Sequence, residues 1–247
     1  MEDRRSATQI HQGSQGQTAI ARTFDPGLRA YMLGVYNYMT SGLLLTGLIA
    51  LGVASTASVR EIFFSVSGSP TALGWIAIIA PLAIVFALSF GINRFSEGTA
   101  KTLFWSYATL MGISLSTVFL AYTGLSIART FFTAAGAFAG LSLWGYTTKK
   151  DMSSWGSFLI MGVVGLLIAL IINMFLQSST LDLIVSGLGV LIFAGLTAYD
   201  TQKIRNLYSE VGGSDFRGKA IVMGALTLYL DFINLFLFLL RLMGERR

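Results

Sequence analysis

The 247-residue sequence contains no cysteine, one histidine and only 12% charged residues. Without cysteine the chain has no disulfide, no thiol nucleophile, no iron–sulfur cluster and no thiolate zinc site. The single histidine, His11, lies in a polar amino-terminal stretch. This position excludes a histidine-based metal centre or a Ser-His-Asp triad from the apolar part of the chain. Proton chemistry there has to use carboxylates, tyrosines or basic residues.

Apolar residues are abundant, at 54% of the chain, and the charged fraction is about half that of a typical soluble domain. Apolar runs of ~20 residues recur, and each is long enough to cross a hydrocarbon core of ~30 Å. A span in lipid has to satisfy its own backbone, so each run is expected to be a helix. The sequence predicts an all-α integral membrane protein with seven transmembrane helices, near residues 30–54, 73–92, 102–123, 126–146, 155–176, 183–202 and 219–240.

The domain organisation and topology follow from the polar and basic residues. Residues 1–28 are polar and aperiodic, which predicts a disordered cytoplasmic tail before one transmembrane domain at 29–247. If the spans alternate, twelve of the 17 lysines and arginines fall on the side of this tail, which predicts a cytoplasmic amino terminus. The basic carboxy-terminal GERR does not fit, unless the last segment is re-entrant. The net charge of +5 is thus a topology signal: the bilayer is the expected partner and nucleic acid is not.

A G-x-x-x-G pattern, formed by Gly136 and Gly140, lies in the fourth span. Small residues at this spacing let transmembrane helices approach closely. The pattern predicts a tight helix contact, either within this chain or between two copies of it.

Two of the twelve acids, Asp200 and Asp231, lie within apolar spans; the others are in the tail, in loops or at span ends. A carboxylate in hydrocarbon is unfavourable by several kcal/mol, so such residues usually face a bundle interior or a wet cavity. The two spans are joined on one side of the membrane, which can bring the acids together. Asp200 is expected at the inner end of its span, whereas Asp231 is expected ~16 Å along the last span. For the two carboxyls to meet, the last helix has to start deeper in the membrane or tilt.

Adjacent carboxylates in a low-dielectric site cannot both ionise cheaply, so the two acids are expected to share one proton. Such a pair can titrate near neutral pH without a histidine. Arg94, at the inner end of the second span, would hold the remaining negative charge, and the cluster would form a pH-biased gate. Further polar side chains that would line this site are Thr197, Asn234 and Asn173.

The segments AYDTQKIRNLY and LYLDFINLFLFLLRLMG, which contain the two acids, resemble the Bax inhibitor family, also called the transmembrane Bax-inhibitor-motif proteins. The similarity is greatest to the bacterial branch and extends over about residues 28–244. Weaker support comes from FALSFGINR, WSYATLMGISLSTVF and TKKDMSSWGSFLIMG.

The resemblance implies a seven-helix fold in which the last helix is central and surrounded by the other six. It implies that Asp200 and Asp231 form a pH sensor to which a basic residue, here Arg94, bonds. It further implies a calcium leak controlled by pH, with calcium as a permeant ion held weakly at the two acids and no cofactor. A bacterial inner-membrane location follows. The eukaryotic members of the family are linked to suppression of cell death and to calcium stores.

Three other functions remain open at this point. An intramembrane aspartyl protease also needs two aspartates, but its G-x-G-D motif is absent, since the second acid lies in Y-L-D. A proton-coupled cation transporter would use intramembrane carboxylates, although no inverted repeat is evident. A non-enzymatic regulator or scaffold of other membrane proteins would use the acids only structurally. The residues by themselves do not select calcium over sodium or protons.

Overall fold

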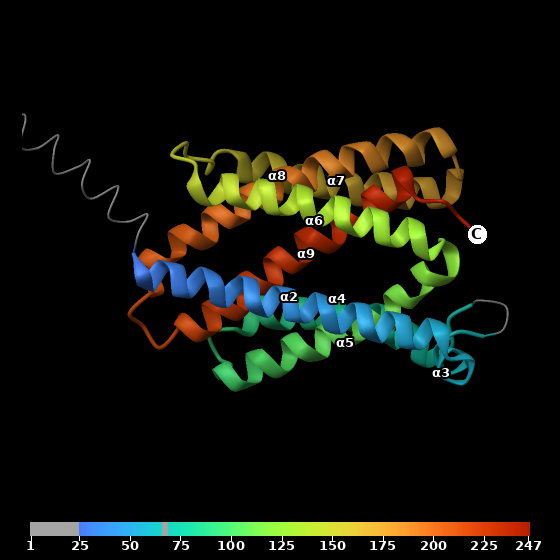
Figure 1. The fold of residues 1–247 in the computed structure, drawn as a ribbon, viewed down its shortest axis with the longest axis horizontal. Helices are drawn as coiled ribbons and strands as arrows, with labels where there is room; N and C mark the ends of the chain where they lie inside the picture. The colour runs from blue at the N-terminus through green and yellow to red at the C-terminus, as the bar shows by residue number, and fades with distance from the viewer. Residues whose placement is uncertain (1–24, 66–68) are drawn as a thin grey trace, which may run out of the picture.

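The computed structural model describes residues 25–65 and 69–247 (Figure 1). The predicted tail falls largely outside this part of the chain, and the first described helix already begins at Pro26. Seven helices are long and apolar enough to cross a membrane, which confirms the predicted number. They are α2 (Pro26–Ser55), α4 (Ala72–Gly91), α5 (Glu97–Ala121), α6 (Gly124–Thr147), α7 (Trp155–Leu176), α8 (Ser179–Val211) and α9 (Arg217–Met243); a short helix, α3 (Ala57–Phe63), joins α2 to α4.

Short polar side chains cap the start of five of the seven long helices. A helix leaves its first backbone N–H groups without partners, and a side-chain oxygen just before the helix can accept from one of them. Asp25 accepts from the Gly27 N–H at 2.7 Å in this way. The same role is played by Thr71, Ser96, Thr123 and Ser178 at α4, α5, α6 and α8. The sequence thus separates the apolar runs with residues that stop one helix and start the next.

Helix α9 is the centre of the bundle. Within its most apolar stretch 67% of the residues are buried, against 39% for α8 and 11% for α7. It packs against α2, α5, α6 and α8, whereas α4 packs mainly on α5, and α7 mainly on α8. The last helix is therefore central, as predicted, but the expected ring of six is an inner layer of four helices with α4 and α7 outside it.

The two ends of the bundle differ in charge. The start of α2 and the turns at 92–96, 148–154 and 212–216 lie at one end, here called the amino end; the chain terminates at the other, the carboxyl end (Figure 1). The amino end carries nine of the fourteen described lysines and arginines. Because α9 runs the full length and Arg246 pairs with Tyr122 at the carboxyl end, the last segment is not re-entrant. The GERR residues thus lie at the end opposite to the start of α2.

Glycine permits close contact between helices at some positions but not at the predicted pair. In α6, Gly145 lies directly against the backbone carbonyl of Ala198 in α8, where a side chain would collide with main-chain atoms. A Cβ on Gly136 or Gly140 would have no neighbour within 4 Å. The expectation that this G-x-x-x-G packs within the chain is therefore wrong, because its face of α6 points out of the bundle.

Two alanine substitutions in α6 test this difference. Gly145→Ala is expected to lower the unfolding free energy by about 1–3 kcal/mol, because the methyl group forces α6 and α8 apart. Gly140→Ala is the matched control and should leave stability unchanged within about 0.5 kcal/mol. Thermal unfolding of the two variants in the same detergent measures both effects. Equal destabilisation would contradict the assigned contact between α6 and α8.

Candidate functional site

The two intramembrane acids meet between α8 and α9. The carboxyl groups of Asp200 and Asp231 are joined by a side-chain hydrogen bond. Both residues are buried, with 9% and 4% of their surface exposed. The structure thus brings together the two acids that the sequence singled out.

The depths of the two acids match because α8 is longer than predicted. The helix continues to Val211, well beyond the expected end at residue 202. Asp200 therefore lies ~16 Å from the end of α8, and Asp231 lies ~21 Å from the start of α9 at Arg217. Since residues 212–216 join these two helix ends, the remaining offset is about one helical turn. No unusual tilt of the last helix is needed.

The charges around the pair are few. A hydrogen bond between two carboxyls requires that one of them carries a proton, so the pair holds at most one negative charge in this arrangement. Within the described part of the chain, the Asp231 Oδ2 atom is buried and accepts no hydrogen bond from any donor. Lys203, one turn after Asp200 and exposed, is the basic residue that acts electrostatically on Asp200. The site is thus a hydrogen-bonded pair of acids whose negative charge protein donors do little to neutralise.

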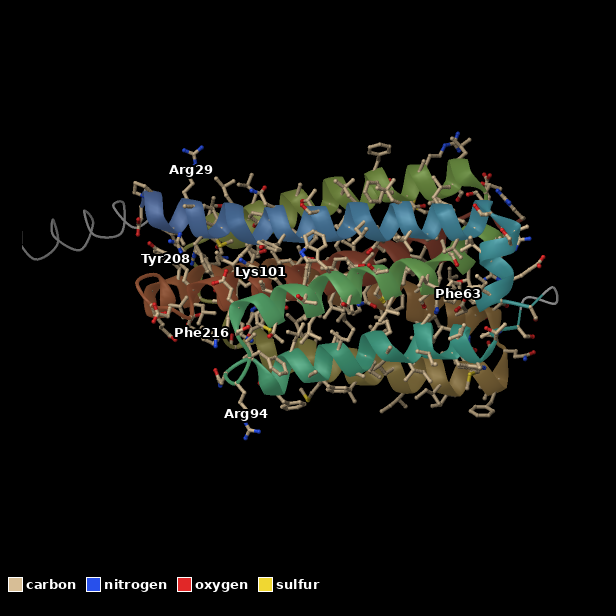
Figure 2. All side chains as sticks on the ribbon, turned by 90° about the horizontal axis from the view of Figure 1, so that it is seen from below. Arg29, Phe63, Arg94, Lys101, Tyr208 and Phe216 are labelled. Carbon is tan, nitrogen blue, oxygen red and sulfur yellow. The ribbon has the colours of Figure 1, made fainter. Side chains whose placement is uncertain are left out.

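Arg94 does not join this pair. Its side chain is exposed, points away from the bundle (Figure 2) and makes no hydrogen bond or salt bridge with any described residue. The inner face of its turn is taken by Lys219 of α9, whose Nζ donates to the carbonyls of Ile92 and Phe95, each at 3.2 Å. A second cation in that space would be repelled. The prediction of Arg94 as the counter-charge is therefore wrong for this structure.

The three further polar candidates have local partners. Thr197 is buried near Asp200, but its hydroxyl donates to the Phe193 carbonyl of its own helix at 2.8 Å. Asn234 likewise donates to the Leu230 carbonyl at 2.9 Å. Asn173 lies at the carboxyl end, where its Oδ1 accepts from the Ser178 N–H at 2.9 Å. Asn173 therefore supports the turn between α7 and α8, and its predicted place beside the acids is wrong.

A chain of hydroxyl groups next to the pair was not predicted. The hydroxyls of Tyr36 in α2 and Ser142 in α6 lie 2.6 Å apart, and those of Ser142 and Thr201 in α8 lie 2.9 Å apart. Thr201 follows Asp200 directly in the sequence, so this chain ties α2 and α6 to the helix that carries the acid. The recurrence of threonine at 197 and 201, one turn apart, is the sequence signal that could have indicated it.

Tyrosine rings pack on the far side of α9, where the Tyr229 hydroxyl is hydrogen-bonded. The Tyr229 hydroxyl lies 2.7 Å from Thr46 Oγ1, and Thr46 also donates to the Ala108 carbonyl. The rings of Tyr107 and Tyr229 meet edge to face, with centroids 5.2 Å apart. Such contacts hold α2, α5 and α9 together on the side of α9 that faces away from the aspartate pair. The pair itself lies between α8 and α9.

Together these features describe a polytopic helical membrane protein with a hydrogen-bonded carboxyl pair beside its central helix. Comparison with known families then gives a match over residues 28–247 to the family described as Inhibitor of apoptosis-promoting Bax1. The chain belongs to this family, the Bax inhibitor family that the sequence resembles.

Bacterial relatives share most of the chain. The Rickettsia prowazekii protein RP147 is 48% identical over 230 residues, which cover 93% of this chain and 95% of the relative. A Caulobacter vibrioides protein is 47% identical over 229 residues, covering 90% of this chain and 91% of its own. The Escherichia coli inner membrane protein YbhL is 46% identical over 223 residues, which cover 90% of this chain and 94% of the relative.

The shared proton leads to a test of stability against pH. As pH rises the proton is lost, and two like charges then face each other in a site with few donors. The melting temperature of the purified protein should therefore fall by several degrees from neutral to alkaline pH. In Asp200→Asn and Asp231→Asn this decrease should be much smaller, because one charge is gone.

Asp215→Asn is the matched control, because Asp215 is exposed in the turn between α8 and α9. It should keep the wild-type dependence on pH. An unchanged pH dependence in both variants of the pair would rule out the shared proton.

Proposed function

We propose that this protein is a pH-sensitive calcium-leak channel in which Asp200 and Asp231 are both the pH sensor and part of the ion path. The observation that carries the proposal is the hydrogen bond between the two carboxyls, about halfway along the central helix. Membership of the Bax inhibitor family supports it. The protein is proposed to act without a cofactor and without catalysing a reaction.

The gate is proposed to use repulsion between like charges. With one proton shared, the pair holds α8 against α9. When that proton leaves, two negative charges in contact favour an arrangement in which the helices separate at this level. Because α8 and α9 are linked by only five residues, 212–216, a shift of one helix is passed to the other. The pair is thus a local electrostatic switch acting on a two-state contact between helices.

Calcium is proposed to bind the separated pair only transiently, as a permeating ion. Calcium takes six to eight oxygen ligands, and two carboxylates provide at most four. Among the described residues, no cluster of three or more acids, histidines or cysteines could hold a metal ion. Water would complete the shell, so binding would be weak, as conduction requires. The acids act as a relay in the pathway and not as a storage site.

The arrangement described here is proposed to be the closed state. Both acids are buried, and aromatic residues, among them the hydrogen-bonded Tyr229, pack on the opposite side of α9. Neither acid lines the groove of about 750 Å³ between α2 and α6. Conduction would therefore need movement around α9. At Asp231 Oδ2 such movement breaks no hydrogen bond, because this buried atom accepts none from the described residues.

The proposed location is the bacterial inner membrane with the amino terminus in the cytoplasm. The name of the Escherichia coli relative supports the membrane, and the concentration of basic residues at the amino end supports the orientation. The proposed partners are the lipid bilayer, calcium and protons. Other membrane proteins are the partners to examine if no ion is conducted.

Calcium entry into liposomes tests the function directly. Wild-type protein, reconstituted with a calcium dye inside the vesicles, should give a flux that changes with pH across the neutral range. Asp200→Asn and Asp231→Asn should each give a flux that no longer depends on pH, because the shared proton is gone. Asp215→Asn, which removes one acid outside the pair, should behave like the wild type.

The same assay separates the other functions. Correctly folded protein that passes no calcium at any pH would overturn the channel and favour a non-conducting membrane regulator. A flux of sodium or protons in place of calcium would overturn the ion assignment and favour a proton-coupled transporter. Cleavage of a transmembrane peptide that needs both aspartates would instead indicate a protease.

A further inference from the structure

A cavity with both polar and apolar walls lies at the carboxyl end, far from the aspartate pair. Its volume is about 580 Å³, and its walls come from the ends of α5, α7, α8 and α9 and from the carboxy-terminal residues. Two arginines, Arg241 and Arg246, line it together with a single carboxylate, Asp182. The remaining wall includes apolar side chains such as Leu170, Met174 and Leu237. The cavity thus has a net positive polar part and an apolar part.

The carboxy-terminal residues hold Arg246 in place. The Thr123 N–H donates to the Glu245 carbonyl at 3.1 Å, and the Arg247 N–H donates to the Ala121 carbonyl at 3.0 Å. The Glu245 N–H also donates to Ser126 Oγ at 2.9 Å. We call these contacts between residues 244–247 and 121–126 the carboxy-terminal clasp. Because three hydrogen bonds position the backbone around Arg246, the side chain need not be ordered from a free tail when a ligand binds.

The guanidinium groups of Arg241 and Arg246 both have N–H donors available for a ligand. Within the described residues, no acid lies in salt-bridge reach of Arg246, which is instead 6.0 Å from the centroid of the Tyr122 ring. Arg241 reaches Asp182 only at 3.7 Å. A guanidinium carries five N–H donors in a planar fork that matches phosphate oxygens. Asp182 lies in the first turn of α8, where the helix dipole also stabilises its charge, so Arg241 can turn toward an anion.

The position of the cavity relative to the membrane indicates that the anion belongs to a lipid. Helix α9 is ~40 Å long, longer than a hydrocarbon core of ~30 Å, so its last turn with Arg241 reaches the headgroup region. Among the apolar wall residues, Leu170 of α7 and Leu237 of α9 lie further toward the middle of these helices. A ligand in this cavity would therefore have a phosphate at the end of the bundle and a hydrocarbon chain directed into the membrane.

We propose that this cavity binds the headgroup of a phospholipid from the leaflet at the carboxyl end, with its phosphate between Arg241 and Arg246. The site is independent of the aspartate pair. It gives a reason for the basic carboxy-terminal GERR, which does not fit the topology rule: at least Arg246 serves as a ligand-binding residue. Bound lipid would brace the clasp against the ends of α5, α8 and α9.

Native mass spectrometry and lipid-dependent melting of the delipidated protein test the site, with phosphatidylglycerol as the probe. In the wild type this lipid should bind and raise the melting temperature in a concentration-dependent way. Arg246→Gln should weaken binding about tenfold, because it removes a charged, forked donor. Arg129→Gln is the matched control: it removes an exposed arginine at the same end that does not line the cavity, and it should bind as the wild type does.

Two further ligands separate headgroup recognition from its alternatives. Diacylglycerol with the same chains lacks the phosphate, and glycerol phosphate lacks the chains; both should bind far more weakly than phosphatidylglycerol. Equal binding of diacylglycerol would overturn recognition of the phosphate. Equal binding of glycerol phosphate would overturn the lipid. An equal loss in Arg246→Gln and Arg129→Gln would show attraction to general positive charge only, and would also overturn the site.

Arg246→Lys covers the case in which Arg246→Gln disturbs the clasp. Lysine keeps the charge and the backbone contacts but loses the fork, so binding should be intermediate between wild type and Arg246→Gln. If Arg246→Lys binds lipid no better than Arg246→Gln while both melt like the wild type without lipid, charge is not what holds the headgroup and the proposal fails.

Discussion

Two carboxyl groups enclosed by apolar helices are the constraint on which this structure depends. One buried acid could remain protonated alone, but two in contact are coupled, so that the charge of each depends on the other. The pair is accommodated because α8 and α9 carry the acids at nearly the same depth and residues 212–216 hold those helices side by side. The same closeness that permits a hydrogen bond between the two carboxyls makes a negative charge on both of them unfavourable.

The central position of α9 follows from the need to enclose these carboxyl groups. A helix that carries an acid near its middle needs protein around it, and α9 is shielded on four sides by α2, α5, α6 and α8. The outer helices α4 and α7 carry no acid in their spans and expose apolar side chains. The bundle thus places its polar chemistry at the centre and its most apolar helices against the lipid.

The two ends of the bundle use basic residues in different ways. At the amino end Lys219 reaches inward and binds the carbonyls of the turn between α4 and α5, while Arg94 extends outward. At the carboxyl end the clasp holds Arg246 over a cavity that also contains Arg241. Counting charges per loop describes topology, but only the geometry distinguishes a cation that supports a turn from one that faces solvent or a ligand.

The sequence by itself determined the seven spans and the importance of the two acids, because hydrophobic length and an isolated carboxylate are local properties of the chain. It also indicated that Asp200 and Asp231 could meet, since consecutive spans share a loop. The tertiary structure decided the rest. The length of α8 removed the depth offset, Lys219 displaced Arg94 from the inside of its turn, and Asn173 became a helix-end support. Side chains at helix ends choose among partners from other helices, and no local pattern records which partner is near.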